Sequence, residues 1–203
     1  MFSYTGYKKT GYTLAEVLIT IGIIGTVAAM TIPSLMMSYQ KRVWESKLKK
    51  IYSIATNACE RMLIEENVSA VNETDLYAGV TNEKLRKYFK LMLDGEEVSG
   101  KGFSITLPDG GVLYLTAAED GFKFITDVNG VATRPNMAGK DIFEFRLDKN
   151  CAYNNSAENT STEAKAFKVV VENDWKIPDN YPSSNSGSSN PSSTSSNNDS
   201  GDS

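Results

Sequence analysis

One apolar run near the N-terminus constrains this chain more than any other feature. The run extends from Tyr12 to about Tyr39, and its one ionisable side chain expected to carry a charge at neutral pH is Glu16. About 20 apolar residues in a helix cross the hydrocarbon core of a bilayer, so this run is long enough to span a membrane with some tilt. A carboxylate in such a helix is costly and usually marks a function or a partner. Glu16 therefore predicts an interaction, and we see no partner for it nearby in the sequence.

The composition argues against several classes of function. The 203 residues suit one modest domain with appendages. The 21 Lys and Arg against 25 Asp and Glu form no strongly basic domain, so we expect no nucleic-acid partner. Histidine is absent, which removes the usual general base and the commonest metal ligand. No nucleophile, phosphate-binding or dinucleotide motif is present. We therefore predict no enzyme activity, no cofactor and no metal site.

Two simpler interpretations of the apolar run are a secretory signal peptide and a plain signal anchor. A secretory signal peptide would be cleaved near Ala28 and Ala29, but the apolar core of such peptides spans about 7 to 15 residues, and this run is longer. A plain signal anchor explains the length of the run but gives no reason for Glu16. Neither interpretation accounts for both features.

A second helical signal follows directly. Apolar residues recur at spacings of three and four, and no glycine or proline interrupts 34–66. The stripe consists of Trp44, Leu48, Ile51, Tyr52, Ala55, Ala58, Cys59, Met62 and Leu63. One continuous helix is therefore expected from about Tyr12 to about Glu66, apolar all round in its first half and burying one side against a globular domain in its second.

The rest of the chain is typical of an α+β domain. A helix is expected at 81–93. Alternating apolar residues and tight turns predict four short strands, at 103–107, 112–116, 121–128 and 141–147. The segment 164–182 fits either a strand or a helix. Together these elements predict a long N-terminal α-helix packed on a small antiparallel β-sheet.

The stretch Lys8–Leu35, KKTGYTLAEVLITIGIIGTVAAMTIPSL, resembles the N-terminal segment of type IV pilins and type II secretion pseudopilins. In that family a prepilin peptidase cuts after a glycine, and the new N-terminal amine is methylated. By this resemblance cleavage falls after Gly11 and Tyr12 becomes the mature N-terminus, where the family most often has phenylalanine. Glu16 is then the fifth mature residue (16 minus 11) and Pro33 the twenty-second (33 minus 11), the positions of the family's glutamate and, in many pilins, of a helix-kinking proline.

The resemblance implies a pilin-like fold and a set of partners. Glu16 would meet the N-terminal amine of a neighbouring subunit during assembly. The implied partners are the prepilin peptidase, other pilin or pseudopilin subunits and an inner-membrane assembly platform. The implied location is the bacterial inner membrane, crossed once, with a cytoplasmic N-terminus. A simple count of basic residues on the two sides of the span favours the reverse orientation, so the orientation rests on the resemblance.

These inferences divide the chain into five segments: a leader (1–11), a membrane and assembly helix (12–39), an amphipathic continuation with a linker (40–74), a globular head (75–181) and a Ser/Asn/Gly-rich tail (182–203). The tail has no apolar side chains with which to form a core, so we expect it to be disordered.

Two local features left alternatives open. Cys59 and Cys151 are the only cysteines, and outside the cytoplasm they could form a disulfide joining head to stem. Two separate buried thiols are the alternative. Asp127, Asn129 and Asp141 lie in a turn-rich stretch, and some pseudopilins bind calcium in their sheet loops. The pattern is only a fragment of a calcium loop, and an Asn-Gly hairpin turn with a long surface loop is the simpler explanation, so no calcium site is predicted.

The sequence thus predicts a structural subunit that is cleaved, methylated and polymerised into a type IV pilus or a type II secretion-type pseudopilus. The resemblance covers major and minor pilins and the pseudopilins of secretion and competence alike. The alternative is a bitopic, membrane-anchored binding domain that does not polymerise.

Overall fold

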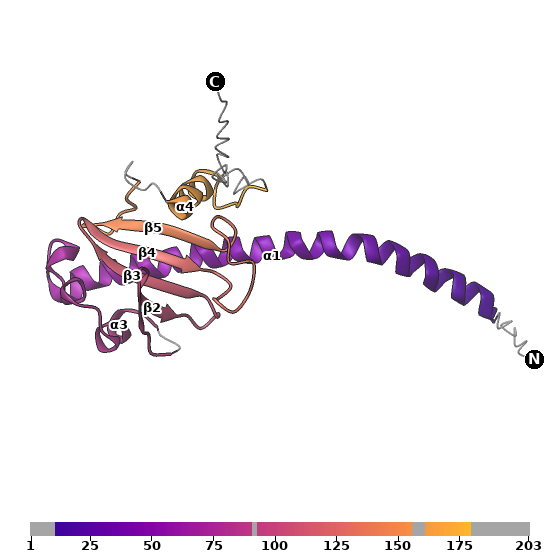
Figure 1. Cartoon of the computed structure of the whole chain (residues 1–203), viewed down its shortest axis with the longest axis horizontal. Helices are drawn as coiled ribbons and strands as arrows, with labels where there is room; N and C mark the ends of the chain where they lie inside the picture. The colour runs from indigo at the N-terminus through magenta and orange to yellow at the C-terminus, as the bar shows by residue number, and fades with distance from the viewer. Residues whose placement is uncertain (1–10, 91–92, 156–160, 180–203) are drawn as a thin grey trace, which may run out of the picture.

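A computed structural model of the chain describes residues 11–90, 93–155 and 161–179. It consists of one long helix and a smaller head that packs along the C-terminal half of that helix (Figure 1). Most of the predicted leader and the whole of the Ser-rich tail lie outside the described residues. The expectation that 182–203 is disordered therefore stays a prediction.

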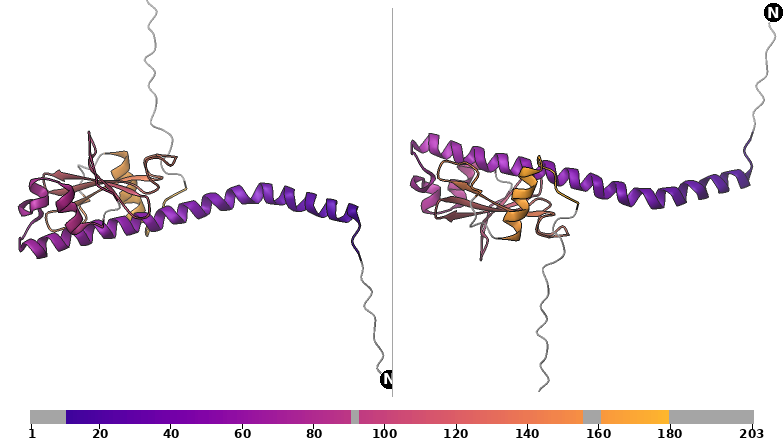
Figure 2. Two further views of the ribbon diagram at one scale, coloured as in Figure 1. Left: turned by 90° about the horizontal axis from the view of Figure 1, so that it is seen from below. Right: turned by 90° about the horizontal axis from the view of Figure 1, so that it is seen from above.

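The long helix α1 (Leu14–Glu66) is continuous over 53 residues, which confirms the expected single helix. At 1.5 Å per residue it is about 80 Å long. Thr13 caps its start, and Asn67 ends it in the left-handed conformation with φ 54°. The N-terminal half projects beyond the head and is gently curved, while the C-terminal half runs along one face of the sheet (Figure 2).

The head contains the expected antiparallel sheet. The described residues form five strands in the order β1-β2-β3-β4-β5, each antiparallel to its neighbour. The strands are β1 (Glu97–Val98), β2 (Gly102–Thr106), β3 (Val112–Ala118), β4 (Gly121–Asp127) and β5 (Ile142–Asp148). Four of the five were predicted, and the two-residue β1 was not. A short 3₁₀ turn, η1 (Val71–Glu73), and the helix α2 (Asp75–Ala78) lead from α1 toward the head.

The structure shortens one predicted helix and decides between strand and helix for the ambiguous segment. The helix expected at 81–93 is shorter: α3 (Asn82–Tyr88) ends before Phe89, which is extended and buried. Leu93 instead forms a β-bridge with Thr106, because the chain turns back toward the sheet edge. The ambiguous segment 164–182 begins within the helix α4 (Thr162–Glu172), which lies along the β5 edge in Figure 1. Its N-cap Ser161 accepts a hydrogen bond from the Ala164 amide (3.0 Å).

Aromatic packing joins α1, β5 and α4. Phe145 of β5 stacks on Phe124 and on Phe167 of α4, with ring centroids 5.0 and 4.9 Å apart. Tyr52 of α1 contacts Phe145 at 5.4 Å and Trp175 at 5.2 Å. Offset and edge-to-face aromatic pairs contribute roughly 0.5–1.5 kcal/mol each beyond the burial of their area. This cluster fixes the C-terminal half of α1 against the β5 side of the sheet.

A polar contact fixes the other side of the sheet to α1. The β2–β3 turn follows the expected Asp109-Gly110 pattern, with Gly110 at φ 83°. Lys50 pairs with the Asp109 carboxylate at 3.0 Å, and Lys47 donates to the Asp109 carbonyl at 3.0 Å. Burial raises the pKa of Asp109, but hydrogen bonds from Lys50 and the Gly111 amide outweigh it and lower this pKa below its usual value. The hairpin is therefore held on the helix at its turn.

The two cysteines form a disulfide in the structure. Cys59 on the buried face of α1 is bonded to Cys151, just after β5, with Cα atoms 5.7 Å apart. Both side chains are buried. The bond closes a loop across 92 positions of sequence and joins the stem to the last strand of the sheet.

We predict that the protein isolated from its native compartment carries this Cys59–Cys151 bond. Peptide mapping under non-reducing conditions should recover the linked pair. Reduction should lower the free energy of unfolding by about 2–5 kcal/mol, because the unfolded chain regains the freedom of a long loop. The double variant C59A/C151A is the control and should not respond to reductant. Two thiols that alkylate freely in unfolded, unreduced protein would contradict the prediction.

Candidate assembly and membrane-spanning helix

The N-terminal half of α1 exposes an unusual amount of apolar surface. The exposed large apolar side chains are Tyr12, Leu14, Val17, Leu18, Ile19, Ile21, Ile23, Ile24, Val27, Met30, Ile32, Leu35, Met36, Met37 and Tyr39. An 18-residue stretch of α1 has no buried residue, and by length and composition the helix can cross a membrane. Soluble monomers rarely expose so large a continuous apolar surface. This exposed apolar surface fits a helix that lies in lipid or against other chains.

Four of the hydroxyl groups in this half are satisfied within the helix. The side chains of Thr20, Thr26, Thr31 and Ser38 each donate to a backbone carbonyl three or four residues earlier, at 2.9 to 3.2 Å. An unpaired hydroxyl in an apolar medium would cost several kcal/mol. With these local bonds the helix presents few unmet polar groups to lipid or to a neighbouring helix.

Glu16 has a partner within its own chain, which corrects the expectation that none lies nearby. Its carboxylate accepts hydrogen bonds from the Thr13 amide (2.8 Å) and the Thr13 hydroxyl (2.9 Å). The Thr13 hydroxyl in turn accepts from the Glu16 amide (3.3 Å), which completes a capping box. The T-x-x-E spacing of this motif was readable in the sequence and would have shown the contact. Glu16 therefore caps α1 while it keeps its charge at the positive end of the helix dipole.

The Gly11–Tyr12 bond, the expected cleavage site, lies just outside the helix. Both residues precede the N-cap and are exposed, Tyr12 by 87%. A methyl group added at Gly11 would meet no atom within 4 Å, so nothing among the described residues crowds this bond.

Pro33 lies inside α1, where it was expected. Proline lacks the amide hydrogen that would bond to the carbonyl four residues earlier, so it weakens a helix locally and favours a bend. In this chain the helix continues on both sides of Pro33. Figure 2 shows that the projecting half of α1 curves.

The residues weighed as calcium ligands instead organise the loop between β4 and β5. Asp127 accepts the amides of Asn129 (3.3 Å) and Gly130 (2.9 Å). Asp141 accepts the amides of Asn136 (2.7 Å) and Met137 (2.6 Å). Burial and the charge of Asp141 raise the pKa of Asp127 above its usual value. No group of three metal-ligating side chains occurs within the described ranges.

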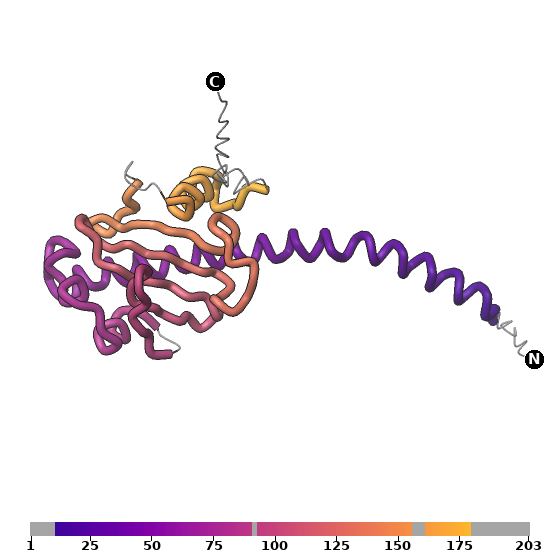
Figure 3. Tube along the Cα trace, in the orientation of Figure 1, coloured from indigo at the N-terminus to yellow at the C-terminus, as the bar shows by residue number. Residues whose placement is uncertain are grey.

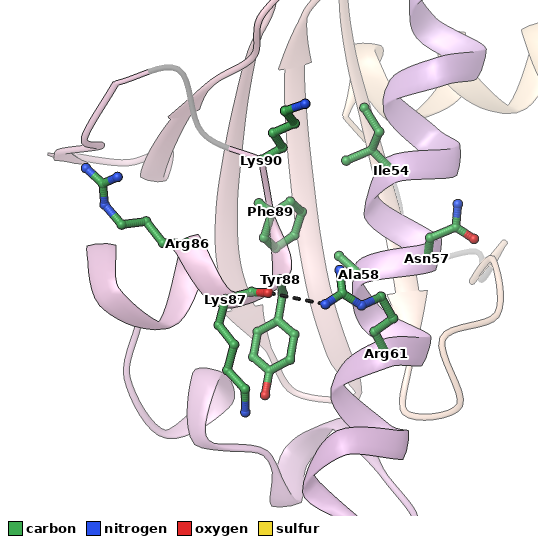
Figure 4. A pocket seen from close by; sticks show the side chains of 9 residues that line it. All are labelled: Ile54, Asn57, Ala58, Arg61, Arg86, Lys87, Tyr88, Phe89 and Lys90. Carbon is green, nitrogen blue, oxygen red and sulfur yellow. Dashed lines mark hydrogen bonds between the residues drawn. The ribbon is translucent and has the colours of Figure 1, made fainter.

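A hollow of about 370 Å³ lies between α1 and the end of α3 (Figure 4). Arg61 donates to the Lys87 carbonyl across it. Three of its four basic side chains have acidic partners: Arg61 and Lys87 pair with Glu65, and Arg86 pairs with Asp94. The hollow brings together no set of groups that suggests a reaction.

Comparison with known proteins gives a distant similarity. The chain is 29% identical over 80 residues to type II secretion system core protein G of Pectobacterium carotovorum subsp. carotovorum. The match covers 39% of this chain and 51% of the other protein, so the chain spans about half the length of the curated relative it matches. No family model and no solved structure matches. Together with a long apolar helix on an antiparallel sheet, this similarity supports a pilin-like structural subunit with a single membrane-spanning helix.

Proposed function

We propose that this chain is a prepilin-type subunit, cleaved after Gly11, methylated at Tyr12 and polymerised into a type IV pilus or a secretion-type pseudopilus. The main support is the contrast between the two halves of α1. The C-terminal half is fastened to a folded head, whereas the N-terminal half is apolar on all sides and its large apolar side chains are exposed. The similarity to a type II secretion protein favours the same class.

Such a helix is suited to two environments. In the membrane its apolar side chains face lipid, with the head on the extracytoplasmic side. In a filament the same side chains pack against equivalent helices of neighbouring subunits. Lipid tails and apolar side chains are similar in polarity. Transfer of the helix from lipid into a filament is therefore driven by close packing and by the pairing of the few polar groups. Processing by a prepilin peptidase and delivery to an inner-membrane assembly platform complete the proposal.

Glu16 would direct the exchange from lipid to filament. Cleavage after Gly11 creates a positive amine at Tyr12, and burying this amine without a counter-charge would cost about 3–5 kcal/mol. In the precursor the Glu16 carboxylate bonds to Thr13. In the filament it would also accept the amine of the next subunit, since a carboxylate can accept several hydrogen bonds. Assembly would then place each amine beside a charge already fixed at the start of α1.

One prediction of this proposal concerns processing. Intact-mass measurement of the protein extracted from its native membrane should give a chain that begins at Tyr12 and carries one added methyl group. The exposed Gly11–Tyr12 bond lies before the helix cap, so cleavage need not unwind α1. A mature chain that retains Met1, or one that starts near Met30, would exclude the prepilin proposal.

The second prediction separates the charge of Glu16 from its capping role. In Glu16→Ala both are lost, so filament yield should fall sharply while membrane insertion and cleavage continue. Glu16→Gln retains a capping side chain but not the charge, because Gln also serves in capping boxes. If the charge pairs with a neighbour's amine, Glu16→Gln should fail to assemble as completely as Glu16→Ala.

Thr13→Ala is the matched control, since it removes the capping hydroxyl and keeps the Glu16 charge. It should lose about 1 kcal/mol of helix stability and still assemble. Sheared surface filaments are compared at equal amounts of cleaved membrane protein. Normal assembly of Glu16→Gln with failure of Thr13→Ala would show that the cap, and not the charge, matters. Normal assembly of Glu16→Ala is the outcome expected for an anchored binding domain that does not polymerise.

A further inference from the structure

A groove of about 830 Å³ lies where α1 leaves the head. One wall is α1, and the others are the β4–β5 loop (128–141) and the segment that follows α4. The tube in Figure 3 shows this loop at the end of the sheet from which the projecting half of α1 emerges. The lining residues that matter here are Met30, Pro33, Lys41, Trp44, Arg134 and Lys140.

The position of the groove along α1 sets its depth in a membrane. If the hydrocarbon core begins near Leu14, about 20 residues at 1.5 Å each bring the helix to its far boundary near Pro33. The groove reaches from Met30 to Trp44. It therefore extends from the edge of the hydrocarbon layer through the headgroup layer, and the base of the head lies at headgroup depth.

The groove combines positive charge with apolar surface. Arg134 and Lys140 are exposed, and neither forms an ion pair with a described residue. Lys41 already pairs with Asp179. On the same loop Val131 and Met137 are 54% and 42% exposed. Basic side chains beside exposed apolar ones are typical of surfaces that bind anionic membranes.

The loop that carries these side chains is held in shape. Asp141 fixes the Asn136 and Met137 amides, and Asp127 fixes the Gly130 amide. The Gly139 amide also donates to the Ile142 carbonyl. A loop fixed in this way loses little conformational freedom when it binds. This gives the two aspartates a role in positioning basic side chains.

We propose that the groove binds the headgroup of an anionic phospholipid in the leaflet next to the head. The lipid phosphate lies between Arg134 and Lys140, and an acyl chain follows Met30 and Pro33. This inference rests on α1 crossing the membrane and not on cleavage or polymerisation. The lipid site can therefore be absent although the chain is cleaved and polymerised, and it can be present although the chain is neither.

The test uses the full chain in lipid nanodiscs with one copy per disc. Hydrogen exchange in 131–140 is compared between discs of phosphatidylcholine alone and discs in which a quarter of the lipid is phosphatidylglycerol. Each basic residue near an anionic surface strengthens binding about fivefold, so the two together should slow hydrogen exchange in this loop by up to about 25-fold. The slowing should diminish at high salt.

R134Q/K140Q should abolish the difference between the two lipid compositions. K149Q/K165Q is the matched control, because it removes the same charge from two exposed lysines that do not line the groove, and it should behave as wild type. Hydrogen exchange in β4 and β5 at the wild-type rate would confirm that both variants fold.

Three results would overturn the proposal. The first is equal exchange in the two lipid compositions, or slowing that persists in R134Q/K140Q. The second is the same slowing when soluble glycerol phosphate is added to phosphatidylcholine discs, which would indicate a free-phosphate site. The third is slowing that appears only with two copies per disc, which would assign the groove to a second subunit.

Discussion

The burial of one face of α1 against the sheet is the contact on which the rest of the molecule depends. From Leu48 onward, apolar residues of α1 lie in the core with the phenylalanines of β4 and β5. The Tyr52 aromatic cluster, the Asp109 turn and the disulfide hold the head to this half at three separate places. Because the helix is continuous, fixing its second half also fixes the direction in which its first half projects.

This arrangement explains how one helix can serve a folded head and an apolar environment together. The change occurs between Tyr39, which is exposed, and Leu48, which is fully buried. Residues 41–50 contain five basic side chains, which suit the layer between lipid and water. Glu16 stands at the opposite end, where the helix dipole and the Thr13 cap make a charge tolerable before any partner arrives. The proposed subunit would lie first in lipid and then in a filament, so its polar groups need partners in both environments.

Much of this could be predicted from the sequence because the signals are periodic and local. The apolar run and the three-and-four stripe gave α1 its length, and alternating residues located four strands within one or two residues.

The predictions that failed did so for physical reasons. The strand β1 is two residues long and exists only by pairing with β2. The end of α3 is decided by the burial of Phe89, which is a tertiary effect. In α4 the β-branched Val169–Val171 favoured a strand, whereas the Ser161 cap and the buried Phe167 and Val170 favour a helix. The groove joins Met30 to Arg134, so no local pattern could reveal it.

The central claim is that the exposed apolar half of α1 is a surface for other copies of this chain. Site-specific photo-cross-linking from Ile24, which is 67% exposed, tests it directly in the native host. With the assembly machinery active, the account predicts adducts between subunits, and with it inactivated, adducts with lipid instead. The same probe at Ile64, 77% exposed but on the half fastened to the head, should give no lipid adduct in either case. Reaction of the Ile24 probe with lipid alone under both conditions would contradict the account.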